Sequence, residues 1–398
     1  MKKNRWMILI VSVMINLCIG FAYAWSVFQK PLMETFGWSA SQASLVFTIN
    51  LAVLPIAMIV AGRLVKKIGV RGVVMTGGVL FGAGIFLSGM IQSIGALYFT
   101  YGLVAGSGIG LIYSCTVSNT VKWFPDKKGL AGGLTAGGFG AGSIIFAPVA
   151  VSFISSQGVL GTFKILGLIF SGVILVLGLL MSSPPEEEAV IESIDQSGKR
   201  ELATKEMLKT SDFYMIWILM VLGCISGLMI ISQASPIGQA KVGLSQEEAA
   251  FAVGFIGLAN ATGRVFWGMV SDKLGRYQTL MMMFLFSSVG LILLVVTSAL
   301  PLFLAAICLI AASYGGVFGL FPSITADLFG VRNMGMNYGV VMTGLSVGAI
   351  IGPQIAAFAV GASGYDLAFM ITVGINICAL VLVLLAKRKS EQLNTAKS

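Results

Sequence analysis

A single arginine lies inside a long apolar stretch of the chain. Arg264 stands within residues 249–270, in the run from Asn260 to Trp267 that reads NATGRVFW. A guanidinium keeps its charge in protein, and its paired N–H groups match the two oxygens of a carboxylate. An ionisable group inside an apolar stretch of membrane-spanning length is a functional candidate by default. Arg264 is therefore the leading candidate for binding a carboxylate anion.

A second interpretation of Arg264 needs no ligand. Ser271 follows it by seven residues, which is about 10 Å along a helix, so the guanidinium could reach the membrane interface by snorkelling. Asn260 lies one turn before Arg264 on the same face. It could orient the guanidinium, bond the substrate, or form a hydrogen bond to a neighbouring helix.

Aromatic residues in other apolar stretches could form the walls of a cavity around the arginine. Tyr113 and Phe318 are 205 residues apart, an offset that recurs along the chain, and Tyr314 lies one turn before Phe318. Tyrosine hydroxyls can donate hydrogen bonds to carboxylate oxygens, although ordinary core packing would explain the same residues. Tyr23, in the first apolar stretch, is a similar candidate.

The elements that position these residues are predicted to be membrane-spanning helices. Of the 398 residues, 57% are hydrophobic and only 10% are charged, which excludes a soluble enzyme, a nucleic-acid-binding protein and a disordered chain. A span needs about 20 apolar residues. The sequence offers twelve such stretches: 6–28, 40–60, 72–91, 96–120, 130–153, 162–181, 213–232, 249–270, 277–297, 302–321, 336–360 and 367–386.

The chain repeats itself. Pro31 and Pro236 follow the first span of each set of six at a separation of 205 residues, and residues 124–148 match residues 329–353 at the same offset. We therefore predict an all-α membrane protein with twelve transmembrane helices in two pseudo-symmetric six-helix halves. The predicted halves are residues 1–181 and 211–398, and the polar stretch 182–210 is the linker between them.

Lysine and arginine predict the orientation in the bilayer. With the N-terminus inside, the inner segments hold 21 of the 25 basic residues, the outer segments hold 3, and Arg264 is left over. Cytoplasmic loops carry such an excess, so we expect both termini and the linker to be cytoplasmic. The formal net charge of +9 then reflects loop charge in a multi-pass protein of the cell inner membrane, and no nucleic-acid partner.

Other chemistries have no residues to support them. The chain has no histidine, and its five cysteines are scattered singly in apolar segments, so we expect no cofactor, no metal site and no disulfide framework. All 16 acids lie in loops or near span ends. We therefore expect no catalytic residues and no enzyme activity, and the only acids open to proton coupling are end-located ones such as Glu248 and Asp366.

Two loops carry related glycine and charge patterns. The loop after the eighth span places Gly268, Asp272 and Arg276 in GMVSDKLGR, and the loop after the second span reads GRLVKKIGV, with Lys66 at the acid position. Glycine permits close helix crossing and an aspartate accepts charge-assisted bonds at a helix end. We predict a conformational latch formed by Gly268, Asp272 and Arg276, and a weaker first copy. A simple basic turn is the alternative.

These loops resemble the signature of the major facilitator superfamily. Together with GFAYAWSVF at 20–28, GSGIGLIY at 106–113, KWFP at 122–125 and Arg264, the chain resembles the oxalate–formate antiporter family, which is similar to monocarboxylate transporters. The resemblance covers essentially the whole chain. It implies the major facilitator fold, transport of a small organic anion by alternating access as proton symport or anion exchange, and contact between the matching arginine and the substrate carboxylate.

The resemblance also has one departure. Oxalate-carrying members pair the arginine with a lysine in the eleventh span, and residues 336–360 contain neither lysine nor arginine. One fixed positive charge suits one carboxylate, so we expect a monocarboxylate of the lactate, pyruvate or formate type, carried by a monomer. The alternatives are an oxalate or dicarboxylate–formate exchanger and a drug efflux carrier, which would not depend on Arg264.

Overall fold

The chain folds almost entirely into long helices. The computed structural model describes residues 4–185, 201–362 and 364–395, and no strand occurs within these ranges. The first part of the chain forms α1 (Arg5–Ile19), the 3-10 helix η1 (Gly20–Ala24), α2 (Trp25–Phe36), α3 (Ala40–Ser88), α4 (Ile94–Leu97), the π-helix η2 (Tyr98–Ala105), α5 (Gly106–Trp123) and α6 (Lys128–Leu180). The second part forms α8 (Thr204–Met207), α9 (Ser211–Val242), α10 (Gln246–Leu274), α11 (Arg276–Val296), α12 (Leu300–Phe329), α13 (Met334–Val341), α14 (Thr343–Ala362) and α15 (Tyr365–Thr395).

Matching sequence signals end and begin corresponding helices. Gly37 ends α2 and Gly243 ends α9, each in the left-handed conformation with φ of 71° and 70°, which glycine adopts without strain. Ser39 and Ser245 then cap α3 and α10 by accepting a hydrogen bond from the backbone N–H three residues on. The first membrane-spanning segment therefore ends at Gly37, beyond its apolar stretch. It continues to residue 36 instead of the predicted 28.

Nine helical segments among the described residues are long and apolar enough to cross a membrane. Two of them, of 48 and 53 residues, are pairs of spans that meet at Gly69 (φ 69°) and Gly158 (φ 71°), where the helical geometry is interrupted. Helix α10, of 29 residues, is also long enough to cross a membrane and packs against both α6 and α12. Counted with it, these segments agree with the predicted twelve spans. The all-α membrane fold is therefore confirmed.

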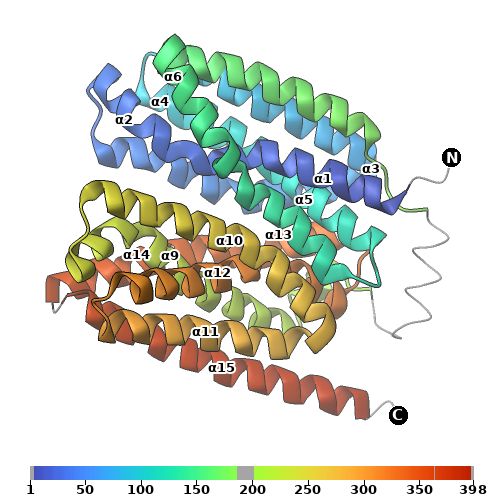
Figure 1. Cartoon of the computed structure of the whole chain (residues 1–398). Coiled ribbons are helices and arrows are strands. Elements are labelled where there is room, and N and C mark those ends of the chain that lie inside the picture. Colours follow the sequence, from blue (N-terminus) through green and yellow to red (C-terminus); the bar gives the residue numbers. More distant parts are fainter. Residues whose placement is uncertain (1–3, 186–200, 363, 396–398) are drawn as a thin grey trace.

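Figure 1 shows two groups of helices side by side. Helices α1–α6, coloured blue to green, form the first group, and helices α9–α15, coloured yellow-green to red, form the second group. The groups meet through α6 with α10 and through α3 with α13. The residue limits of the predicted halves and linker stay predictions, and residues 186–200 of the linker lie outside the described residues.

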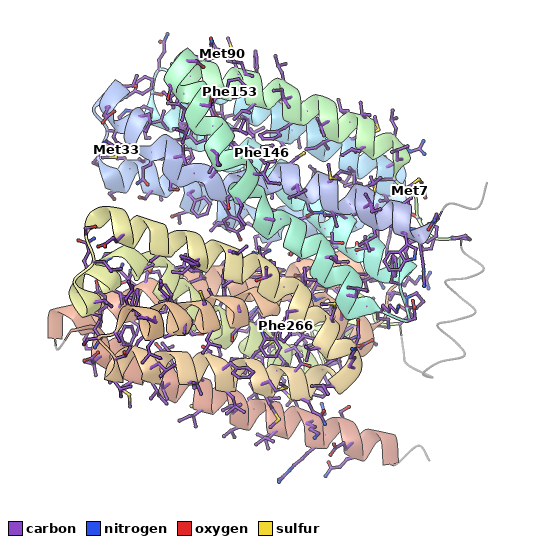
Figure 2. The ribbon with its side chains drawn as sticks, in the orientation of Figure 1. Met7, Met33, Met90, Phe146, Phe153 and Phe266 are labelled. Carbon is purple, nitrogen blue, oxygen red and sulfur yellow. The ribbon has the colours of Figure 1, made fainter. Side chains whose placement is uncertain are left out.

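The outside of the bundle is apolar. Met90 and Phe266 are 59% and 51% exposed and are labelled in Figure 2. Long apolar side chains of this kind recur along the outer surfaces of most helices. A surface of this composition is suited to lipid tails and would be costly in water.

One end of the bundle, which we call the basic end, holds the start of α1 and the end of α15 (Figure 1). Ion pairs join helices there. Lys128 of α6 pairs with Asp327 of α12 at 2.8 Å, and the Nε atom of Arg276 donates to the same aspartate at 2.9 Å. The first pair joins the two helix groups, so the basic end is closed in this conformation.

Candidate functional site

Arg264 is buried in the middle of the bundle. Its side chain is 1% exposed, and it points back along α10 toward Asn260. The Nε and Nη2 atoms of Arg264 both donate to Oδ1 of Asn260, at 3.1 and 3.0 Å. Asn260 therefore orients the guanidinium. The side chain runs away from Ser271 and the basic end, which is opposite to the direction that snorkelling would require.

A backbone carbonyl of the other helix group accepts a further hydrogen bond from the arginine. The Nη1 atom of Arg264 donates to the carbonyl oxygen of Ala136 on α6 at 3.1 Å. A guanidinium has five N–H donors, two of them on each terminal nitrogen. The bonds to Asn260 and Ala136 use three of these donors, and the hydroxyl of Tyr23 lies within side-chain hydrogen-bonding reach of the guanidinium. A carboxylate that bound the remaining donors would compete with the Tyr23 hydroxyl for one of them.

Aromatic rings surround the guanidinium. The carbon atom Cζ of Arg264 lies 4.6 Å from the ring centre of Phe318, 5.8 Å from that of Phe139 and 5.9 Å from that of Tyr23. At these distances a cation is attracted to the ring faces. Tyr23 and Phe318 were candidates from sequence, whereas Phe139 was not, because the residue at its repeat offset of 205 is Gly344.

The other tyrosines form a second layer. Tyr314 packs edge-on against Phe318 with ring centres 5.2 Å apart, and Tyr113 packs against Phe139 at 5.3 Å. Both tyrosines lie close enough to Arg264 to interact with it electrostatically. The structure thus brings together all six residues that the sequence singled out for substrate binding; their role as substrate ligands stays a prediction.

Sequence reasoning missed Tyr338 of α13. Its side chain is fully buried beside Tyr113, and the hydroxyls of both tyrosines lack a hydrogen-bond partner of ordinary geometry. Repeat matching could not find it, because the residue at the offset of 205 is Gly133. The sequence marks it only as an aromatic residue among the glycines and asparagines that follow Arg332.

No acid of the described residues neutralises the arginine. None of their ion pairs includes Arg264. Asp366 pairs instead with Lys241, and Glu248 caps α10 by accepting from the N–H of Ser245 at 2.9 Å. The described part of the chain also has no group of three or more His, Cys, Asp or Glu side chains placed to hold a metal ion.

A cavity of about 610 Å³ lies beside this cluster. It runs between the two helix groups, and Tyr23, which contacts Arg264, is part of its wall. Its other walls are mostly apolar, with scattered hydroxyl and amide groups. They comprise Trp25, Ser26, Gln29, Ser44, Phe47, Thr48, Leu51, Ala52, Leu228, Ile231, Ser232, Leu345, Ser346, Ala349, Ile350 and Pro353.

The three predicted latch residues also lie together, at the basic end. The carboxylate of Asp272 accepts hydrogen bonds from the backbone N–H groups of Gly129 and Leu130, each at 2.8 Å, in the first turn of α6. Arg276 donates to the same carboxylate at 2.7 Å. Gly268 packs so closely on Gly129 that a side chain on either would collide with the other's backbone. These contacts join the two helix groups, and an acid there also complements the helix dipole.

Comparisons with known proteins agree with this architecture. The family model described as Major Facilitator Superfamily matches residues 8–261 and 229–398. The chain is 31% identical to the oxalate:formate antiporter of Oxalobacter formigenes over 382 residues, which is 95% of this chain and 90% of that protein. It is 27% identical to human monocarboxylate transporter 12 over 92% of this chain and 77% of that protein.

Solved structures show the same fold. The crystal structure of the transporter FucP in the outward conformation superposes with a TM-score of 0.74 at 14% identity, covering 95% of this chain and 98% of that one. The human organic anion transporter MFSD10 superposes with a TM-score of 0.75 at 12% identity, over 96% of this chain and 100% of that one.

Proposed function

Because the chain belongs to the Major Facilitator Superfamily, we propose that it carries a small monocarboxylate anion across the cell membrane by alternating access. It is a multi-span membrane transporter related to the oxalate:formate antiporter and the monocarboxylate transporters. The observation that carries the choice of substrate is Arg264. Its guanidinium is buried without an acid partner among the described residues, and its bonds to Asn260 and Ala136 use only three of its five N–H donors.

The cavity itself offers no charge, so the charge available to a bound anion is that of Arg264, which contacts the cavity-lining Tyr23. Its lining includes no lysine, arginine or acid, and the wall from α14 consists of Leu345, Ser346, Ala349, Ile350 and Pro353. A dianion such as oxalate would place its second carboxylate against this wall without a cation. Burying an unpaired charge is unfavourable by several kcal/mol. A short apolar or hydroxylated tail fits these residues, so lactate, pyruvate and formate are favoured over a dicarboxylate.

Alternating access needs a closed end that can open. The basic end is held by the Asp272 bonds to α6 and by the Lys128–Asp327 pair. We place this end in the cytoplasm, in an inner-membrane orientation with both termini inside, because the excess of lysine and arginine lies there. Rocking of the two helix groups would then expose Arg264 to either side in turn.

Counterflow in proteoliposomes tests the proposal. Vesicles loaded with unlabelled substrate should accumulate labelled formate, lactate or pyruvate, and Arg264→Gln should abolish this accumulation. Accumulation of oxalate in preference to all three monocarboxylates would instead support a dicarboxylate exchanger. Transport of lipophilic drugs that is insensitive to Arg264→Gln would identify an efflux carrier.

A further inference from the structure

The described end of the linker is bound to the turn between α12 and α13. The carboxylate of Glu201 accepts hydrogen bonds from the backbone N–H groups of Val331 and Arg332, at 3.1 and 2.8 Å. The N–H of Leu202 donates to the carbonyl oxygen of Phe329 at 3.0 Å. A carboxylate that accepts two backbone N–H groups makes charge-assisted bonds, which are among the stronger hydrogen bonds in proteins.

The turn is shaped to receive this carboxylate. Gly330 has a φ of 80°, and a side chain at this position would collide with Glu201. The carbonyl oxygen of Leu202 also accepts from the side-chain amides of Asn333 and Asn337, at 3.1 and 3.2 Å. Glu201 is therefore held in place by several groups of the second helix group, and does not rest on the surface by chance.

This site lies three residues before the position where the repeat would place a second latch. In the intact copy, Asp272 of the second group binds the N–H groups of residues 129 and 130, just after the turn that precedes the helix. At the offset of 205, those residues correspond to 334 and 335, at the start of α13. Lys66 occupies the acid position of the first copy. It cannot accept a hydrogen bond, and it donates to Oδ1 of Asn333 at 2.7 Å instead.

Glu201 also faces positive charge from the first helix group. Lys122, near the end of α5, lies close enough to both Glu201 and Lys66 to interact electrostatically with them. The Glu201 carboxylate thus interacts both with backbone N–H groups of the second group and with a lysine of the first group. Attraction to both stabilises contact between the groups at the basic end.

We propose that Glu201 replaces the acid that the first copy of the latch has lost. The linker carboxylate binds the turn before α13, attracts Lys122 of the first group, and so helps to close the basic end. The chain then has two latches of different construction. One is a loop aspartate, and the other is a glutamate supplied by the segment that connects the two groups.

Distances between the two helix groups test this directly. In a variant with all five native cysteines replaced, spin labels at positions 71 and 273, two exposed sites at the basic end, report its opening by double electron–electron resonance. Glu201→Gln removes the negative charge and leaves one side-chain oxygen to accept from the N–H groups of Val331 and Arg332. We expect the ratio of open to closed molecules to rise about tenfold, equivalent to about 1.4 kcal/mol.

Two further variants make the test specific. Glu206→Gln removes the same charge from the same segment, where the carboxylate only caps α8, and should leave the distances unchanged. Lys66→Asp added to Glu201→Gln restores an acid at the first-copy position and should return the closed population.

Unchanged distances in Glu201→Gln would overturn the proposal. So would an equal shift in Glu206→Gln, or a failure of Lys66→Asp to restore closure, because Glu201 would then act only through net charge or as an anchor for the linker. The measurement needs no substrate, so its outcome is independent of whether the protein carries a monocarboxylate.

Discussion

Replacing Arg264 by lysine separates the charge of the site from its geometry. The guanidinium makes three hydrogen bonds to Asn260 and Ala136, at 3.0 to 3.1 Å, and its two other N–H donors are left for the Tyr23 hydroxyl or a carboxylate. A lysine ammonium has three donors on one atom. The ammonium cannot donate hydrogen bonds to Asn260 and Ala136 and also to both oxygens of a carboxylate.

The expected loss follows from the bonds removed. A hydrogen bond to a charged group contributes about 1.5–3 kcal/mol, so losing one of the two bonds to the carboxylate should weaken binding by roughly ten- to hundredfold. Arg264→Gln also removes the charge. Leaving a buried charge without its partner costs about 3–5 kcal/mol, or roughly two to four decades in affinity.

Substrate binding to purified protein and counterflow in proteoliposomes measure these losses, with correct membrane insertion checked for each variant. Arg388→Lys, at an exposed position near the end of α15, is the matched control and should be unaffected. Near-normal binding and counterflow by correctly inserted Arg264→Lys would refute a bidentate carboxylate site, because they would mean that positive charge alone is sufficient.

Three further predictions concern the site and the latch. Asp272→Asn should weaken the bonds to α6 by about 1–3 kcal/mol, open the basic end and slow transport; unchanged inter-group distances and flux would contradict a latch. Gly140→Ala would place a Cβ atom 2.9 Å from Nε of Arg264 and should reduce substrate affinity at least tenfold. The control Gly172→Ala, whose Cβ atom would meet no atom within 4 Å, should leave the affinity unchanged. Equal affinities of the two variants would show that the guanidinium can move freely. Because Arg264 has no acid partner among the described residues, the empty site keeps a net charge that is unfavourable to occlude, so exchange should outpace net flux; equal rates without pH dependence would argue against this.

The sequence predicts most of the fold because membrane spans are long and apolar. The breaks at Gly69 and Gly158 fall between stretches that the sequence separates as distinct spans. The span ends were less accurate, since Gly37 and not the last apolar residue ends the first membrane-spanning segment. Capping and turn geometry decide these ends, and they depend on a few residues outside the apolar stretches.

The site was predictable where it depends on side-chain type and spacing. Arg264 and Asn260 are one turn apart on one helix, so their hydrogen bonds follow from helix geometry alone. The carbonyl of Ala136 could not be found, because every residue has such a carbonyl and only the packing of α6 on α10 selects this one. Glu201 was similarly hidden, as one of several acids in a polar stretch whose binding partner lies about 130 residues further along the chain.

The contact between α6 and α10 has a consequence for the speed of the transport cycle. On α6, Gly133 and Gly137 leave no side chain toward α10, and a Cβ atom at these positions would lie 2.6 Å from the carbonyl oxygen of Arg264 and 2.8 Å from Cγ2 of Val265. The two groups therefore meet there through nearly smooth backbone surfaces. Relative motion of such surfaces does not have to disengage interlocked side chains, so the barrier to rocking should come mainly from the polar contacts that cross the interface, such as the bonds from Asp272 to α6.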